Sequence, residues 1–499
     1  MEQNSLGVIT DKEGFFGRFL TKLLFIALLM ALFWSPLWFG TPQNKELQKT
    51  LIENKVDLKP QDASPASLFS SAYVALFQNS YPNKNLEYLL FFIGIVAVLA
   101  LAARCKVLLK SHNVTYTGIG WALIMLPIMA SGKMSKLAQF RDPWGTALFV
   151  LYGAFFYAAA VGFLERKRRD AAAVVICLAM IAVAFNAAAQ FHGGLERTRE
   201  LYAQEQGFSD FAAYTNNWLA STHNAEETYS FQRLVSPRVS ANFTSPNILA
   251  AYSMLAFFVA LGLWKSSRTK VIKTLGGAAA VLALLTLFYT RSKSVIAITF
   301  VMAAAWGFVL FKAKELSKTW LFVILGVGAL FTAASFLWGY GANLGAKLSS
   351  SGGARLTYWK VAVRMLRQKP LTGCGYNSFD YWYRAWKPQG AEPSRFVHNT
   401  ILQMWAEFGM FAALGSLLAL TLPFVNGWDN FKFSFKKDAF QLACIVASIG
   451  FFLHNLLDFD FYVPGLMLTG LFVLSMALRG REDDDNNEET KDAAVPAQN

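Results

Sequence analysis

A long polar segment between Tyr340 and His398 carries side chains whose types could do chemistry. Nine basic residues stand there against two acidic ones, which leaves a net charge of +7. An excess of cationic groups on this scale favours an anionic partner, either phospholipid head groups or a phosphorylated substrate. Because long polar loops are where a largely apolar chain can place reactive groups, we expect the functional site here.

His398 closes this segment and is followed by Asn399. A neutral imidazole at that position could accept a proton near physiological pH, which makes His398 a candidate general base. The alternative is a polar anchor or cap at the start of the next apolar span. His454, with Asp458 and Asp460 after it, is a second candidate of the same kind.

A helical spacing within the polar segment separates its charges into two groups. Lys360, Arg364 and Arg367 fall on one face, which predicts contact with water or head groups. Arg355 instead falls in line with Trp359 on the apolar face. An arginine on a packed face is costly unless it meets an anion, although from the first helical turn it could also reach out to solvent.

Two further arginines lie at the ends of apolar spans. Arg291 shares a very short turn with Lys293, and Arg238 precedes the segment from Asn242 to Asn247. Each could be a simple interfacial anchor. If they converged with Arg355 from separate loops, the three guanidiniums would form a cradle for a pyrophosphate, because the planar fork of arginine matches phosphate oxygens.

The sequence indicates neither a metal nor a cofactor. No cluster of His, Cys and carboxylate residues has metal-ligand spacing, and the four cysteines show no paired spacing. The pair Gly373 and Gly375 is too short a motif to predict a phosphate-binding loop. The formal charge of +14 could suggest nucleic acid, but the basic residues form short clusters between apolar spans, so we expect no nucleic-acid partner.

The elements that must position these residues are apolar helices. Of the 499 residues, 55% are hydrophobic, 15% aromatic and only 16% charged, and the mean hydropathy is +0.34. This composition predicts an all-α polytopic membrane protein. At about 20 apolar residues per span, we expect about 12 transmembrane helices. They fall at 20–39, 86–103, 114–130, 144–163, 171–189, 247–264, 274–290, 294–311, 319–338, 400–424, 439–455 and 463–478.

Short basic clusters occupy every second connection between these spans, which the positive-inside rule assigns to the cytoplasm. We therefore expect both termini in the cytoplasm: residues 1–19, and an acidic tail at 479–499 that is disordered. The long connections 40–85, 190–246 and 339–399 then lie on the opposite side of the membrane.

In this division the transmembrane domain covers residues 20–478. The loop at 339–399, between the ninth and tenth spans, is expected to be periplasmic, partly helical and catalytic. We expect the protein in a bacterial inner membrane, in contact with membrane lipid.

The later part of the chain resembles the O-antigen ligase and O-antigen polymerase group of bacterial polytopic membrane glycosyltransferases. The Arg291 turn and the Asn242 to Asn247 segment resemble family elements, and the resemblance covers roughly residues 235–425. Its main motifs are Arg355-x-x-x-Trp359, Pro370-Leu371-x-Gly373-x-Gly375-x-Asn377-x-Phe379, His398-Asn399 with Leu402, and Glu407-x-Gly409.

The resemblance implies transfer of a glycan from undecaprenyl pyrophosphate to an acceptor on the periplasmic side, without metal or nucleotide sugar. It implies that Arg291 and Arg355 bind the pyrophosphate and stabilise its leaving charge. His398 would orient or deprotonate the acceptor hydroxyl, which attacks with inversion. Arg238 would be a third contact. The turn reads Thr-Arg-Ser-Lys where the family commonly has a Ser-Arg pair, so either Arg291 or Lys293 could be the functional cation.

Trp359, Arg364 and Asn399, which lie in or beside the matching motifs, are expected on the substrate-binding surface. We expect a ligase with lipid A core as acceptor. A polymerase or a protein O-oligosaccharyltransferase would use the same donor with a different acceptor. A solute transporter is the third class, although few ionisable residues fall within the spans.

Overall fold

The computed structural model describes residues 15–38, 94, 112–134, 143–163, 166–223, 225–340, 344–433 and 438–478. Over these residues the regular structure is helical, which confirms the all-α prediction. The helices are α1 (Phe15–Trp38), α5 (His112–Met134), α6 (Pro143–Gly162), α7 (Arg166–Ala189), α8 (Leu195–Glu205), α9 (Phe211–Leu219), α10 (Ala225–Val235), α11 (Pro246–Ser266), α12 (Lys270–Thr290), α13 (Lys293–Lys312), α14 (Lys318–Tyr340), α15 (Leu344–Gln368), α16 (Phe379–Trp386), α17 (Thr400–Phe408), α18 (Met410–Phe433), α19 (Ala439–Asn455) and α20 (Pro464–Ala477).

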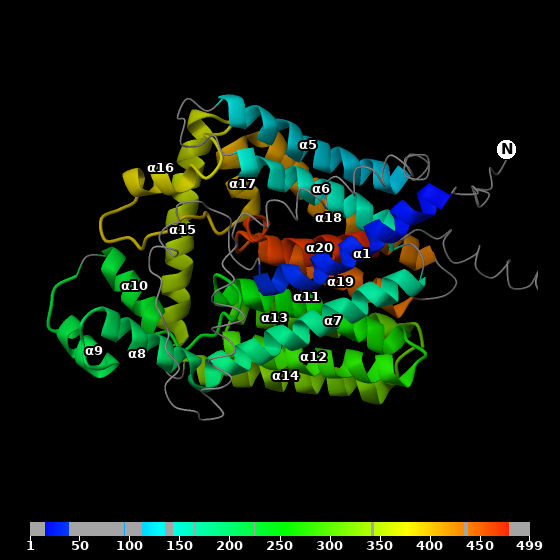
Figure 1. Ribbon diagram of the computed structural model, residues 1–499, viewed down its shortest axis with the longest axis horizontal. Helices are drawn as coiled ribbons and strands as arrows, with labels where there is room; N and C mark the ends of the chain where they lie inside the picture. The colour runs from blue at the N-terminus through cyan, green and yellow to red at the C-terminus, as the bar shows by residue number, and fades with distance from the viewer. Residues whose placement is uncertain are drawn as a thin grey trace, which may run out of the picture.

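The apolar helices lie side by side along one axis and form a bundle (Figure 1). Helix α11 is at its centre and packs against α7, α12 and α19, so that its residues from Ile248 to Ala260 are buried. By length and composition, six helices in the described part of the chain could cross a membrane, and five shorter helical segments are also apolar. The chain is thus a multi-pass membrane protein.

The predicted spans agree with these helices with one correction. Span 86–103 lies outside the described residues except for residue 94, and the loop 40–85 and the tail 479–499 lie wholly outside them. Each other span overlaps an apolar helix. The predicted tenth span, 400–424, is wrong as one helix: the structure has the short helix α17, a break at Gly409, and then the long helix α18.

The break at Gly409 follows from a close backbone contact. Gly409 has a φ of 91°, and a Cβ atom there would overlap the carbonyl of Leu371. The next residue, Met410, donates its backbone N–H to the carbonyl of Pro370 at 3.0 Å. Only glycine fits both this conformation and this contact.

The glycine-containing motif before α16 makes a second close backbone contact with the end of α17. The backbone N–H groups of Cys374 and Gly375 donate to the carbonyls of Ala406 and Glu407, each at 2.9 Å. Gly373 has a φ of 66° and lies against the backbone of Glu407, where a Cβ atom would overlap it. The motif therefore fixes the loop against the end of α17.

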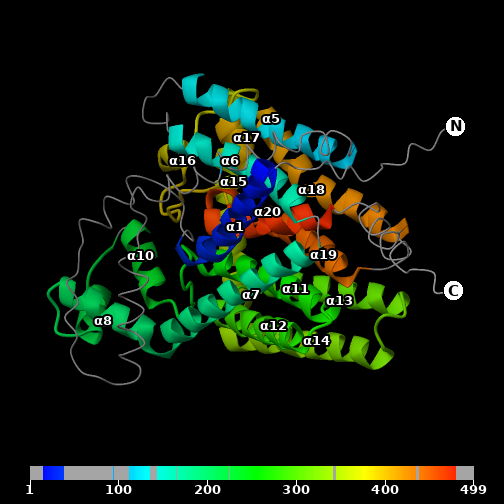
Figure 2. The same ribbon diagram turned by 45° about the vertical axis from the view of Figure 1, so that its right-hand side comes forward.

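One end of the bundle carries the polar helices, and we call it the polar end. Helix α15 crosses the ends of the apolar helices nearly at a right angle, with α16 beside it, and α8, α9 and α10 lie further out (Figure 1). After rotation by 45°, α8 and α10 still lie to one side of the bundle (Figure 2). Helix α7 leads to α8 through a π-helical turn, Gln190–Gly194, that bends at Gly193 with a φ of 139°.

An ion pair joins α7 to α19 near the other end of these two helices. Arg169 of α7 is only 2% exposed, and its Nη1 atom lies 2.6 Å from Oδ2 of Asp438, the residue that caps α19. The guanidinium also contacts Asp170 at 3.1 Å and lies 4.6 Å from the ring centre of Phe440. Loss of one partner from a buried pair leaves an uncompensated charge, so this contact strongly favours one pairing of the two helices.

Candidate active site

The segment between α10 and α11 is held by a side chain that follows α7. Oε1 of Gln190 accepts hydrogen bonds from the backbone N–H groups of Ser240 at 2.9 Å and Ala241 at 2.7 Å. Ala241 has a φ of 46°, a conformation that these two bonds support. These bonds therefore also fix the position of Arg238, two residues before Ser240, relative to the bundle.

Arg238 bridges the start of α11 and the turn between α12 and α13. Its Nε donates to the carbonyl of Thr290 at 2.9 Å, and its Nη2 donates to Oδ1 of Asn247 at 2.6 Å. The hydroxyl of Ser292 donates to the same Asn247 oxygen at 3.0 Å. Asn247 thus links Arg238 to the turn that contains Arg291.

The charges of Arg291 and Arg355 act on Arg238. The pKa of Arg238 is lowered to about 10, chiefly by burial; the charges of the two neighbouring arginines also lower it, and Asp458 opposes them. With this pKa the guanidinium is still cationic at neutral pH. The structure therefore brings together the three arginines that the sequence suggested for an anion cradle.

Lys293 faces a different neighbour. It is buried in the first turn of α13, and its Nζ atom lies 5.5 Å from the ring centre of Phe336 on α14. Arg291 is the left-handed C-cap of α12, with a φ of 52°, and its charge acts on Arg238. Of the two cations in this turn, Arg291 is the one whose charge acts on Arg238.

Arg355 is half-buried on α15, and its Nε donates to the carbonyl of Leu457 at 3.2 Å. The neighbouring face of α15 carries the buried residues Tyr358 and Ala362. This contact holds Arg355 beside the loop between α19 and α20, which also carries Asp458. Arg355 thus bonds to the backbone of this loop, and its charge acts on Arg238.

His398 lies just before α17 and contacts a buried carboxylate. Its Nδ1 atom is 3.0 Å from Oδ1 of Asp458; the histidine side chain is 25% exposed and the aspartate only 1%. The imidazole stacks on the ring of Tyr358 and meets Phe459 edge-on. His398 has a φ of 53°, so the backbone is also held in an uncommon conformation.

Several charges act on Asp458. Burial alone would raise its pKa, but the charges of His398, His454 and Arg355 hold the pKa of Asp458 below its usual range. Behind it, Nδ1 of His454 lies 2.8 Å from Oδ2 of Asp460. Both are buried, so His454 supports Asp458 from within and does not face the cavity.

Asn399 is the N-cap of α17. Its Oδ1 accepts from the backbone N–H of Leu402 at 2.9 Å, and its Nδ2 donates to the carbonyl of Leu456 at 3.0 Å. These bonds hold α17 against the end of α19. Both polar groups of the Asn399 side chain are thus engaged in positioning α17 and the neighbouring His398, and a substrate contact of Asn399 stays a prediction.

Two expected substrate residues are directed elsewhere. Trp359 packs against the cluster under α15, which includes Tyr358 and Met365. Arg364 is exposed, and its guanidinium lies 4.3 Å from the ring centre of Trp386. Neither side chain lines the cavity described next.

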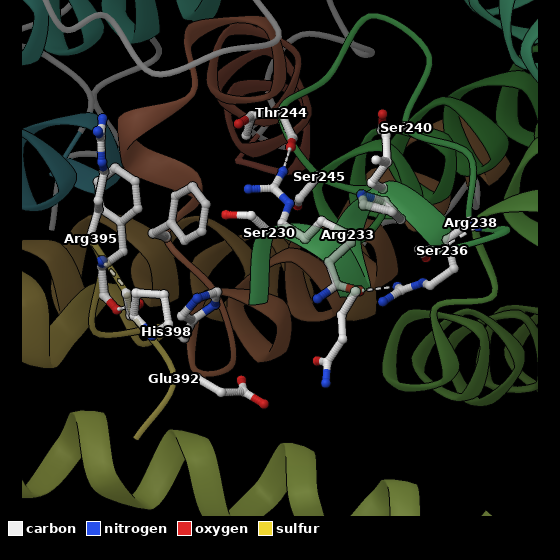
Figure 3. A pocket seen from close by; sticks show the side chains of 18 of the residues that line it. Ser230, Arg233, Ser236, Arg238, Ser240, Thr244, Ser245, Glu392, Arg395 and His398 are labelled. Atoms are coloured by element: carbon white, nitrogen blue, oxygen red, sulfur yellow. Dashed lines mark hydrogen bonds between the residues drawn. The ribbon is translucent and has the colours of Figure 1, made fainter. Parts of the chain in front are cut away.

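A cavity of about 770 Å³ opens at the polar end beside these groups. One wall comes from α8, α10 and residues 236–247, and the other from residues 376–398 with the loop after α19 (Figure 3). Arg238 and His398 line it, whereas Arg291 and Arg355 are not among its lining residues. The charged residues of its lining are Arg199, Arg233, Arg238, Asp380, Arg384, Glu392 and Arg395.

Sequence reasoning missed the roles of Asn247 and of the wall from α8 and α10. Asn247 was part of a resembling segment, but its bonds to Arg238 and Ser292 join three separate parts of the chain. Asp458 had been noted only as a neighbour of His454. The available signal was an acidic residue at the end of an apolar span, because such a group usually has a nearby cation.

Within the described ranges, no group of three or more His, Cys, Asp or Glu side chains is arranged to hold a metal ion. Residues 278–417 match the model of the family described as O-antigen ligase. This match confirms the family resemblance over a region that includes Arg291, Arg355 and His398. No curated protein matches the chain.

Proposed function

From the membership of residues 278–417 in the O-antigen ligase family, we propose that the chain transfers a glycan from undecaprenyl pyrophosphate to lipid A core. The family implies a membrane glycosyltransferase, and the donor, the acceptor and the roles of the residues are the proposal. The observation that carries it is the contact between His398 and Asp458 beside three arginines, at a cavity large enough for sugars.

His398 acts as the general base. Its Nδ1 atom is engaged by Asp458, which leaves Nε2 to accept the proton of the acceptor hydroxyl. The acceptor oxygen then forms a bond to the anomeric carbon of the donor sugar, and the bond from that carbon to the pyrophosphate oxygen breaks. A single displacement of this kind inverts the anomeric configuration. The proton remains on His398, beside the anionic Asp458.

The arginines stabilise the leaving group. Negative charge develops on the pyrophosphate as the glycosidic bond breaks, and Arg238, Arg291 and Arg355 present fixed positive charge to it. Since their positions are held by Asn247, the α12–α13 turn and Leu457, little rearrangement is needed during the reaction.

The membrane arrangement is part of the proposal. The polar end faces the periplasm of a bacterial inner membrane, with residues 339–399 as the catalytic loop of the transmembrane domain 20–478. Both termini, 1–19 and 479–499, lie in the cytoplasm. The basic clusters between spans support this orientation. With span 86–103, the apolar helices give twelve crossings.

The experiment is glycan transfer by purified protein in liposomes, in the presence of a chelator. The donor is undecaprenyl-pyrophosphate glycan, supplied with lipid A core or without any acceptor. We expect product on lipid A core that disappears with His398→Ala and persists with the control His223→Ala, whose histidine lies away from the cavity.

Three results would contradict the ligase. Lengthened lipid-linked glycan in the absence of acceptor would identify a polymerase, and transfer only to an added protein would identify a protein O-oligosaccharyltransferase. Absence of any transfer, with uptake of solute by the same liposomes, would return the transporter.

A further inference from the structure

The cavity holds more positive charge than the donor pyrophosphate requires. Its lining contains five arginines against two carboxylates, and Arg238 is the one of these five that belongs to the arginine group assigned to the leaving pyrophosphate. Arg199 is engaged with the carbonyls of Leu234, Val235 and Ser236, and Arg384 is paired with Asp380 at 2.9 Å. Arg233 and Arg395 are two further cationic side chains of the lining, and both are exposed.

Arg233 and Arg395 come from opposite walls. Arg233 is on the last turn of α10, where its Nη2 donates to the carbonyl of Thr244 at 3.1 Å, and Arg395 lies three residues before His398 (Figure 3). Both side chains are exposed to the cavity. In the described part of the chain, no carboxylate forms an ion pair with Arg395.

The rest of this region suits a glycan. Hydroxyl groups of Ser230, Thr244, Ser245 and Ser394 line the cavity together with the carboxylate of Glu392. Hydroxyl and carboxylate side chains exchange hydrogen bonds with sugar hydroxyls. The lining also includes aromatic rings, which offer apolar faces to sugar carbons.

We propose that Arg233 and Arg395 form an anion-binding subsite for the acceptor, which recognises a glycan carrying a carboxylate or phosphate group near the hydroxyl that is glycosylated. This inference rests on the proposed function, because it assigns the acceptor to the space beside His398. Arg233 and the rest of the α10 wall lie outside the region matching the family, residues 278–417, so this wall is not fixed by what the family shares, and we assign the choice of acceptor to it.

The test compares wild-type protein with Arg233→Gln, Arg395→Gln and the control Arg367→Gln, an exposed arginine of α15 outside the cavity. The acceptor is lipid A core, used intact, after removal of its phosphates, or after reduction of its carboxylates. We expect each cavity substitution to raise the acceptor KM about ten-fold, because a charge-assisted hydrogen bond is lost, with the donor KM unchanged.

The modified acceptors identify the anion. Wild-type protein should show the raised KM with whichever acceptor lacks the recognised group, and Arg233→Gln and Arg395→Gln should raise that KM no further. Equal use of all three acceptors by wild-type protein would overturn the subsite. So would a rise in the donor KM in place of the acceptor KM, because the arginines would then belong to the donor.

Direct binding of the three acceptors to the purified protein separates this inference from the proposed function. Tighter binding of the intact acceptor that is lost in Arg233→Gln and Arg395→Gln supports the subsite even if no transfer occurs. Transfer to lipid A core without any such binding difference supports the function and overturns the subsite.

Discussion

The Nδ1 atom of His398 lies 3.0 Å from Oδ1 of Asp458, although 60 residues separate them in the chain. The aspartate is buried and its pKa lies below the usual range, so it is ionised at neutral pH. A carboxylate in this place fixes the imidazole tautomer that carries its proton on Nδ1. The other nitrogen then points away from the protein interior.

We predict that Asp458→Asn lowers the kcat of glycan transfer by about a hundredfold or more, because the neutral amide does not hold the catalytic tautomer or stabilise the imidazolium. Donor binding should change little, since the three arginines remain. Steady-state kinetics with both substrates measures the two effects. An unchanged kcat would show that His398 does not act through Asp458.

The two cations of the α12–α13 turn should respond differently. Arg291→Gln should lower the rate of transfer and weaken donor binding by about ten-fold, because the pyrophosphate loses one of the positive charges grouped around Arg238. Lys293→Gln should reduce thermal stability more than donor affinity, since its Nζ atom lies near Phe336. Donor titration and melting of both variants decide between them. Weaker donor binding in Lys293→Gln alone would reverse the assignment.

Asn247 should be sensitive to a change of charge without a change of size. In Asn247→Asp a carboxylate would pair with Arg238 at the position where the amide oxygen now accepts its bond. We expect the donor KM to rise by about ten-fold, because the new anion competes with the pyrophosphate. Asn216→Asp on the exposed face of α9 is the matched control. A donor KM like that of the control would mean that Arg238 does not bind the donor.

Two effects on stability at Gly409 can be distinguished, that of its positive φ and that of its close contact with the Leu371 backbone. Gly409 and Gly390 both have positive φ, at 91° and 78°, but only at Gly409 would a Cβ atom meet neighbouring backbone. Gly390→Ala should cost about 1 kcal/mol, and Gly409→Ala several times more. Thermal melting in detergent compares them. Equal shifts would mean that α17 and α18 can separate from Leu371 without loss.

Glu407 should make stability depend on pH. It is buried, where burial raises its pKa to about 7 against the hydrogen bonds from Tyr462, the Asn377 and Phe379 backbone, and Gln403. Because the folded pKa exceeds the unfolded value near 4.5, this contribution is present below pH 4.5 and is lost as the pH rises to about 7. The loss is on the order of 3 kcal/mol.

Melting temperatures of wild-type protein and Glu407→Gln between pH 4.5 and 8 measure this effect. The wild-type melting temperature should fall across the range, and the variant, which has no titrating group at this position, should lack that part of the slope. Parallel curves for the two proteins would show that Glu407 does not titrate in this range.

Much of the fold could be predicted because its cause is local. A run of about 20 apolar residues forms a helix in lipid whatever its neighbours are, so the apolar spans are found from sequence alone. The break at Gly409 could not be found in this way. It results from contact with Leu371, and the surrounding residues continue the apolar pattern on both sides.

In the candidate site, too, features within one helix could be predicted, whereas contacts between distant segments could not. Helical spacing correctly separated Arg355 from the exposed Arg364, since both lie on one helix. The same spacing put Trp359 on the apolar face, where it packs against a cluster from α16 and α17; its expected place on the substrate surface came from the motif resemblance alone. The bond from His398 to Asp458 depends on how α17 meets α19, which no pattern within either segment reports.

The buried ion pair of Arg169 with Asp438 lies far from the cavity, yet the positions of the Arg238 segment and the Asp458 loop depend on it. Helix α7 runs from this pair to Gln190, which fixes the Arg238 segment, and α19 runs from it to the loop of Asp458. The two helices are lever arms of roughly 25 to 35 Å. A tilt of one degree at the pair moves the far end by about 0.5 Å, a large share of the 1 Å at which a reaction geometry fails.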